Sequence, residues 1–149
     1  MDHLVDTALL MRLANTRDAQ HGTARHAVVT LGRRGDGLRT APQNLIEFRN
    51  SATRPVAANG LGFTLAQVET LAAGFEAAFP LLPETPDIYP AWKALVRAAG
   101  VAGKQVHDAR LVAVCQVHGV GHILTFNVPH FARLTAHAPG VAVVDPRTV

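Results

Sequence analysis

Short apolar runs alternate with segments of helical periodicity along the whole chain, and this alternation constrains the fold more than any other feature. Short apolar runs are typical of strands that are covered on both faces, and parallel strands need helical crossovers between them. The pattern therefore predicts an α/β fold with a central, mostly parallel sheet. Because 149 residues fit one domain and no repeat or long linker divides them, we expect a single domain over residues 1–149.

Turn and cap residues divide the sequence into expected elements. Strands are expected at residues 3–5, 38–40, 81–82, 122–126 and 141–144. Helices are expected at residues 7–15, 22–34, 42–53, 64–79 and 104–118, with one more that opens at Pro86 or Pro90 and ends at Gly100. The clearest helix start is at Thr64, because Gln67 follows it at the spacing of a capping box.

Basic residues are concentrated in the first part of the chain. Residues 1–54 carry eight Arg against five acids, whereas residues 55–149 carry six basic and six acidic groups. Arg makes up twelve of the fourteen basic residues, and its planar fork suits bidentate contacts with phosphate. A GC-rich genome produces the same excess of Arg, so the charge distribution leaves a polyanionic partner open.

The composition argues against several classes of protein. Hydrophobic residues make up 48% of the sequence, which is too many for a disordered chain. The longest uncharged stretch, residues 111–132, includes Gln116 and Asn127, which are costly in hydrocarbon, so we expect no membrane span. The first residues, MDHLVDT, lack the pattern of a secretory signal. With Cys115 as the single cysteine no internal disulfide forms, and we expect a cytoplasmic protein.

Eight histidines raise the question of a zinc site. His118 and His122 have the spacing of a helical ligand pair, but Gly119 and Gly121 interrupt a helix there. The chain has one cysteine and no HExxH motif, so zinc binding is not expected. Cys115 is expected to be an inert thiol on the apolar face of its helix.

Three acids and one asparagine fall where α/β proteins bind ligands, beyond the carboxyl ends of the strands. Asp6 follows the first expected strand, and Asn127 follows the strand at residues 122–126. Glu47 lies about one turn into the helix after the second strand, and Asp108 lies near the start of its helix. These positions make the three acids candidates for a common site.

Asp108 shares one helix face with Leu111, Val112 and Cys115. A carboxylate on an apolar face needs a partner, because an isolated buried charge is costly. In one interpretation each acid is paired with an arginine or stabilised by a helix N-terminus. In the other, the three carboxylates converge on a hard divalent ion, which prefers oxygen ligands. The pattern alone leaves both interpretations open.

Four segments, HLVDTALLMRLAN, APQNLIEFRNSATRP, VHDARLVAVCQVHGVGHILTFN and the terminal VAVVDP, resemble the PIN-domain family in order and spacing. The resemblance covers nearly the whole chain, including LLPETPDIYPAWKALV, and is strongest to the VapC-type toxins of bacterial toxin–antitoxin pairs. It implies a PIN-like three-layer α/β/α fold with a central, mostly parallel sheet of about five short strands.

The resemblance also implies a function and its residues. Asp6, Glu47 and Asp108 match the catalytic metal-binding acids, and Thr7 matches a supporting residue beside the first of them. The implied activity is that of a Mg²⁺- or Mn²⁺-dependent endoribonuclease, in which a metal-activated water hydrolyses RNA phosphodiesters. The implied partners are the RNA substrate, a cognate antitoxin protein and a second copy of the chain in a homodimer.

The chain departs from the family pattern at three positions. Ala8 stands where the family often has Asn, Asn127 where it often has a fourth acid, and His130 where a further acid often precedes the Phe of the next turn. Asn127 remains a candidate metal ligand because an amide oxygen can bind a hard cation, and Asn127 and His130 are candidate supporting residues. These departures support an alternative, a catalytically weakened or inactive PIN module that acts by binding RNA or protein.

Overall fold

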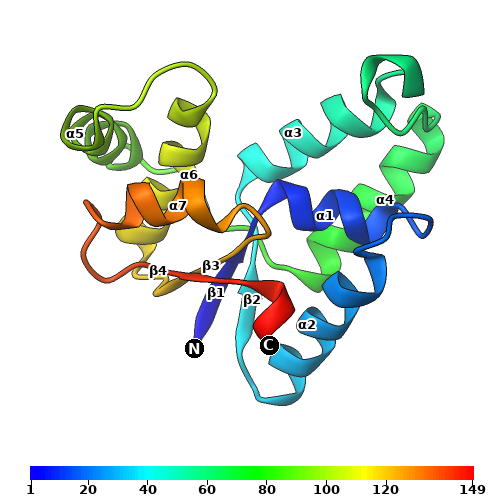
Figure 1. Cartoon of the computed structure of the whole chain (residues 1–149), viewed down its shortest axis with the longest axis horizontal. Helices are drawn as coiled ribbons and strands as arrows, with labels where there is room; N and C mark the ends of the chain where they lie inside the picture. The colour runs from blue at the N-terminus through cyan, green and yellow to red at the C-terminus, as the bar shows by residue number, and fades with distance from the viewer.

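A four-stranded parallel sheet lies at the centre of the computed structural model, which describes residues 1–149 (Figure 1). The strand order is β2-β1-β3-β4, and every neighbouring pair is parallel. The strands are β1 (Asp2–Val5), β2 (Gly37–Arg39), β3 (His122–Leu124) and β4 (Ala142–Val144). The predicted α/β class and parallel sheet are therefore confirmed.

The prediction of a fifth strand at residues 81–82 is wrong. Leu81 forms only an isolated parallel bridge with Thr40, beside the end of β2. The Leu82 N–H donates to the Thr40 carbonyl at 2.7 Å, and the Thr40 N–H donates to the Pro80 carbonyl at 3.3 Å. Pro80 and Pro83 enclose the two leucines and have no N–H to donate, so the ladder cannot extend in either direction.

Seven α-helices and two short 3₁₀ turns complete the chain. The helices are α1 (Thr7–Ala14), α2 (His21–Arg33), α3 (Pro42–Thr53), α4 (Leu65–Ala78), α5 (Ile88–Ala99), α6 (Gln105–His118) and α7 (Val128–Thr135). The 3₁₀ turns are η1 (Val56–Ala58) and η2 (Pro146–Thr148). The capping box is confirmed, since the Thr64 hydroxyl accepts from the Gln67 N–H and the Gln67 side chain accepts from the Thr64 N–H.

Helix α7 was not predicted from the sequence, and the strand expected at residues 122–126 ends early, at Leu124. Only three residues separate the helix from that strand, so the apolar character of the two segments runs together. Pro129 lies in its first turn, and Phe131 and Leu134 bury one face at a spacing of three residues. These are the signals by which the helix could have been found.

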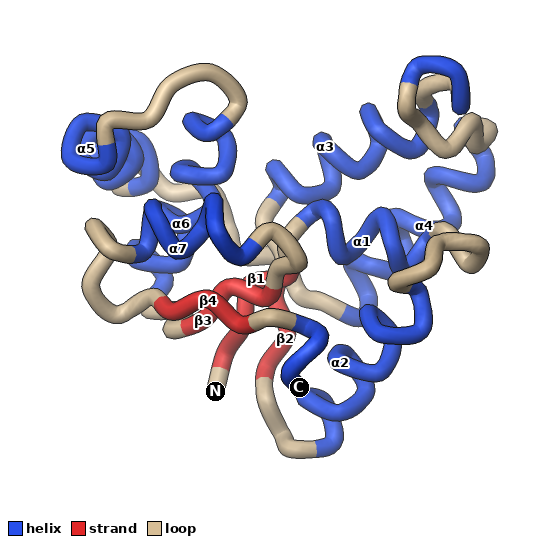
Figure 2. Tube along the Cα trace, in the orientation of Figure 1, coloured by secondary structure: helices blue, strands red, loops and turns tan.

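The helices cover both faces of the sheet, as Figures 1 and 2 show. Leu4 and Ile123 point into one core with α5, α6 and α7, whereas the next residues, Val5 and Leu124, point into a second core with α1 to α4. Successive strand residues alternate between faces, so two short strands supply both cores. The expected three-layer α/β/α arrangement is confirmed.

No helix in the structure combines the length and the apolar character needed to cross a bilayer.

Cys115 is fully buried in the α5–α7 core, and burial raises the pKa of its thiol to about 12. The predicted inert core thiol is therefore confirmed.

Candidate active site

Asp6 lies immediately beyond the carboxyl end of β1, at the N-cap of α1. Its N–H continues the β1–β3 ladder by donating to the Leu124 carbonyl at 3.1 Å. Its carboxylate does not cap the helix; instead Oδ2 accepts a hydrogen bond from the Thr125 hydroxyl at 2.7 Å. Thr125 follows β3, so the two neighbouring strand ends hold this side chain.

Asp6 is a buried acid with a strongly perturbed pKa. Only 5% of the residue is exposed. The pKa of its carboxyl is raised from the usual value near 3.8 to about 7, mainly by burial and also by the charges of Asp108 and Glu47, against the opposing hydrogen bond from Thr125. The hydrogen bonds that stabilise the ionised carboxylate therefore do not offset its loss of hydration.

Glu47 projects from α3 and is held at both carboxylate oxygens. Its Oε2 accepts from the Thr7 hydroxyl at 2.7 Å, and its Oε1 accepts from the Gln43 amide at 2.7 Å. Thr7 Oγ1 in turn accepts from Asn44 Nδ2 at 3.2 Å. Thr7, the residue after Asp6, thus links the first acid to the second.

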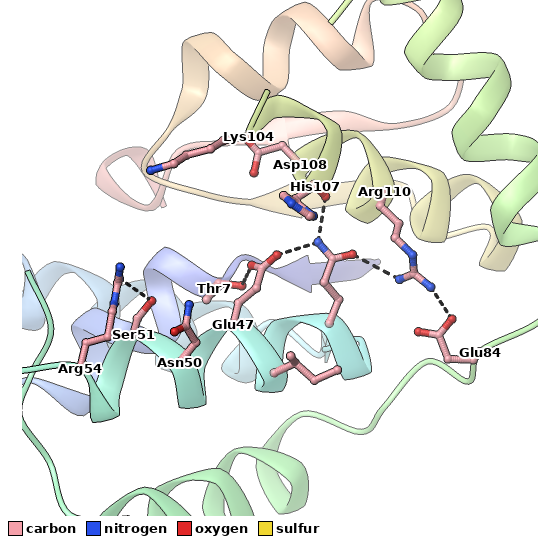
Figure 3. Close-up of a pocket in the computed structure, with 12 residues that line it drawn as sticks. Thr7, Glu47, Asn50, Ser51, Arg54, Glu84, Lys104, His107, Asp108 and Arg110 are labelled. Carbon is pink, nitrogen blue, oxygen red and sulfur yellow. Dashed lines mark hydrogen bonds and ion pairs between the residues drawn. The ribbon is translucent and has the colours of Figure 1, made fainter. Parts of the chain in front are cut away.

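Asp108 lies in the first turn of α6, on the wall of the site opposite Glu47 (Figure 3), and its charge also acts on Asp6. Burial, followed by the charge of Glu47, raises the pKa of its carboxyl to about 6, whereas His130 and His107 lower it. None of the ion pairs in the chain involves Asp6, Glu47 or Asp108. The arginine pairing in the first interpretation is therefore wrong, whereas its other part agrees with the positions of Asp6 at the N-cap of α1 and of Asp108 in the first turn of α6.

A pocket of about 780 Å³ opens beside the acids (Figure 3). Glu47 and Asp108 line this pocket, and Asp6 does not. Its walls come mainly from α3 and from the start of α6, and the lining residues are Thr7, Gln43, Ile46, Glu47, Asn50, Ser51, Arg54, Glu84, Lys104, His107, Asp108 and Arg110.

Gln43 bridges the two walls of this pocket. Its amide nitrogen donates to Glu47 and also to the His107 carbonyl on α6, at 2.8 Å. Its oxygen accepts from Arg110 at 3.2 Å, and Arg110 donates to Glu84 at 2.6 Å. Figure 3 shows the chain of bonds, which ties helices from opposite layers together. We call these residues, Gln43, Arg110 and Glu84, the clamp.

Asn127 and His130 lie near the acids but do not line the pocket. The Asn127 amide nitrogen and His130 Nδ1 are 2.9 Å apart. The Asn127 N–H donates to Thr125 Oγ1 at 3.0 Å, so Asn127 reaches Asp6 through Thr125. His130 acts on Asp108 through its charge.

The donor set is the kind that Mg²⁺ and Mn²⁺ prefer. Asp6, Glu47 and Asp108 supply only oxygen, and their mutual repulsion calls for a cation. No group of three His, Cys, Asp or Glu side chains stands close enough to hold an ion as arranged.

Sequence reasoning did not single out Thr125, Gln43 or Asn44. Thr125 and Asn44 are fully buried polar residues beside apolar neighbours, and this contrast is the signal that could have identified them. Gln43 precedes Glu47 by one helical turn, a spacing at which side chains meet.

Known proteins match this chain in structure. No protein-family model and no curated protein matches its sequence. A chain of VapBC2 from Rickettsia felis, bound to a promoter DNA fragment, has a TM-score of 0.72 at 11% identity and covers 97% of this chain and 98% of its own. VapBC-1 from nontypeable Haemophilus influenzae gives 0.68 at 16% identity, with 98% of each chain covered. FitAcB from Neisseria gonorrhoeae gives 0.67 at 12% identity, with 100% of each covered. At these identities the likeness establishes the fold over the whole chain, and nothing finer.

Proposed function

We propose that this chain, which has the PIN-like fold of the VapC-type proteins, is a metal-dependent endoribonuclease and the toxin of a type II toxin–antitoxin pair. Residues 1–149 act as one catalytic domain, because the three acids come from elements that belong to both cores. The protein hydrolyses single-stranded RNA in the cytoplasm.

One observation carries the proposal: three carboxylates without an ion-pair partner perturb one another at the carboxyl ends of the strands, and two of them, Glu47 and Asp108, line an open pocket. A purely structural acid cluster has no reason to remain unneutralised, since each buried charge costs free energy. Perturbed acids beside a pocket are the usual sign of a functional site.

Asp6, Glu47 and Asp108 hold the ion in this proposal. When bound, Mg²⁺ or Mn²⁺ supplies a water of lowered pKa and neutralises negative charge on the phosphate. Thr125 fixes one oxygen of Asp6, which leaves Oδ1 as a ligand. Thr7 fixes Glu47 from the opposite side.

Asn127 and His130 are supporting residues in the same proposal. Asn127 steadies Thr125 by its N–H, and His130 brings positive charge toward Asp108 when protonated. Asn127 becomes a ligand only if its amide leaves His130 and turns toward the acids.

The proposed partners are a cognate antitoxin and a second copy of the chain. The matched VapBC2, VapBC-1 and FitAcB structures carry the names of two-component assemblies, and together with the resemblance to VapC-type toxins this supports an antitoxin for this chain. A basic side chain of the antitoxin entering the pocket would neutralise Glu47 and Asp108 in place of the ion.

The test is RNA cleavage by the purified protein with Mn²⁺ and with chelator. Asp6→Ala, Glu47→Ala and Asp108→Ala should each reduce cleavage by at least about a hundredfold, as loss of electrostatic stabilisation does in other enzymes. Glu76→Ala is the matched control, because Glu76 is an exposed acid on α4 remote from the pocket. Cleavage that persists in chelator or in all three variants would contradict the assignment.

The second candidate is an inactive module that binds RNA or protein. It is favoured by Asn127 and His130, which stand at positions where related chains often have acids. Binding of RNA by the parent chain without any cleavage, in Mg²⁺ or Mn²⁺, would select this alternative.

A further inference from the structure

Helix α3 presents a polar stripe to the pocket, with Gln43, Glu47, Ser51 and Arg54 following one another at intervals of three or four residues. Arg54 stands at the C-cap of the helix, about 10 Å along the axis from Glu47. Gln43 stands about 6 Å from Glu47 in the opposite direction. The stripe therefore runs from the clamp, past an acid, to an arginine.

Helix α6 forms the facing wall, and its charged residues follow the same order across the pocket: a basic residue at one end, then an acid, then the clamp. Lys104, at its N-cap, lies about 6 Å before Asp108, and Arg110 lies just after Asp108. In Figure 3 Lys104 lies on the same side of the acids as Arg54, and Arg110 lies on the other side with Glu84. Each end of the pocket thus has one basic residue from α6, with the acids between.

The two ends differ in net charge. Arg110 is paired with Glu84 and held by Gln43, so the clamp end is neutralised. Lys104 and Arg54 are exposed and belong to no ion pair, and the one side-chain bond of Arg54 is to the Ser51 hydroxyl at 3.2 Å. We call Arg54 and Lys104 the free cation pair.

We propose that a single strand of RNA enters the pocket between Arg54 and Lys104, and that these two residues bind its backbone phosphates on one side of the scissile bond. The clamp end takes no phosphate contact. The inference rests on the proposed ribonuclease function and adds the direction from which the substrate reaches the acids.

Electrostatics favour the entry of RNA at the end of the pocket that holds Arg54 and Lys104. Three carboxylates repel a polyanion, so a strand that reaches them must gain phosphate contacts nearby, and unpaired Arg and Lys provide them. The partial positive charge at the amino end of α6 lies at this end of the pocket, and the partial negative charge at the carboxyl end of α3 is offset there by Arg54, the C-cap residue.

The experiment measures binding and cleavage separately. A fluorescent poly-uridine RNA of about ten nucleotides is titrated in chelator, and its affinity is followed from low to high salt by anisotropy. The variants are Arg54→Ala, Lys104→Ala and the double variant. Arg25→Ala and Lys93→Ala are matched controls, because both residues are exposed and neither lines the pocket. Thermal melts report folding.

Each change in the free cation pair should weaken binding by about tenfold at low salt, as loss of one hydrogen bond to a charged group does. The salt slope for a single strand should fall by about 0.7 for each cation, and by about 1.4 in the double variant. With Mn²⁺, the same variants should raise KM and leave kcat nearly unchanged. The controls should match the parent in each measurement.

Parent-like affinity and salt slope in the folded double variant would overturn the proposal. An acidic peptide forms a second arm of the titration: if the peptide and not the RNA loses affinity in the double variant, the cations bind a protein and the proposal is wrong. If the double variant does not fold, the two single variants decide by the same measure.

Failure of the proposed function gives a different result. If the parent chain binds the RNA through the free cation pair but never cleaves it, the ribonuclease function is contradicted and the proposed entry path is supported. If the parent chain cleaves the RNA and the double variant binds it as well as the parent does, only the proposed entry path is contradicted. A parent chain that neither binds nor cleaves contradicts both.

Discussion

The two ends of the neighbouring strands β1 and β3 both bury a titratable side chain, Asp6 at the carboxyl end and His3 nearer the amino end, with different consequences. At the carboxyl edge, Asp6 and Thr125 meet beside an open pocket. At the amino edge, His3 and His122 stack with ring centroids 4.7 Å apart, and His3 is only 3% exposed. Both nitrogens of His3 and Nδ1 of His122 have no hydrogen-bond partner.

Burial is the largest cause of the pKa shift at both edges. It raises the pKa of Asp6, and it lowers the pKa of His3, with His122 lowering that value further and Asp36 raising it. Only the carboxyl edge combines the perturbed groups with a pocket, two further acids and an oxygen donor set. A perturbed pKa therefore indicates function only together with such geometry.

The largest expected effect is on the stability of the metal-free protein. Asp6→Asn keeps an acceptor for Thr125 and removes the buried charge, so it should raise the melting temperature at pH 8 by several degrees. For a chain of this size about 1 kcal/mol corresponds to about 2–4 °C. Glu76→Gln, at an exposed acid, is the control. A marked fall in the Asp6→Asn melting temperature would mean that the ionised carboxylate stabilises the fold.

Acidification should change the stability of the fold in opposite directions through the acids at one end of the strands and through His3 at the other. The folded pKa values of Asp6 (about 7) and Asp108 (about 6) exceed the unfolded value near 3.8, so the folded state binds more protons in this range and stability rises as pH falls from 8 toward 5. The folded pKa of His3 lies below 6.5, so the unfolded state binds more protons and acid destabilises the fold there.

His3→Phe should therefore remove the acid penalty at the amino edge. The melting temperature of the variant, relative to its own value at pH 8, should rise more at pH 5 than that of the parent. Phe retains a ring to stack on His122 and removes the two unpaired nitrogens. An unchanged pH profile would show that the buried imidazole of His3 does not control acid stability.

Gln43→Ala should act on catalysis more than on folding. The substitution releases one oxygen of Glu47 and breaks the bridge to His107 and Arg110. We expect kcat to fall by roughly tenfold, as loss of a hydrogen bond to a charged group does, with KM changed much less. A rise in KM at constant kcat would instead assign Gln43 to substrate binding.

Asn127→Asp should give the smallest effect. Because this side chain already faces His130, the new carboxylate pairs with that imidazole. We expect little change in metal affinity and a modest change in the pH dependence of stability. A clear gain in metal affinity by calorimetry would place residue 127 among the ligands.

Local signals made much of the fold predictable. Helices α3 and α4 were placed within a residue or so, because Pro42, the Thr64–Gln67 box and Pro55 act on their immediate neighbours. The strand at residues 81–82 was predicted wrongly. A strand forms only where it can make a ladder of hydrogen bonds with a neighbouring strand, and the prolines that flank Leu81 and Leu82 prevent such a ladder.

The same distinction separates the parts of the site. The sequence predicts Asp6, Glu47 and Asp108 as site residues from their positions at element ends and from family resemblance. The bond from Thr125 to Asp6 spans 119 residues, and the bond from Gln43 to His107 spans 64. Such contacts depend on how strands and helices are placed in space, and no local pattern encodes them.

The central claim is that Asp6, Glu47 and Asp108 hold one divalent ion, and a calorimetric titration of Mn²⁺ into the metal-free protein tests it most directly. At pH 7.5 the parent should bind one ion and release protons, because carboxyls with raised pKa values must ionise fully. Asp6→Asn and Asp108→Asn should each lose this binding, and His3→Phe should retain it. Equal binding by the parent and both carboxylate variants would contradict the account.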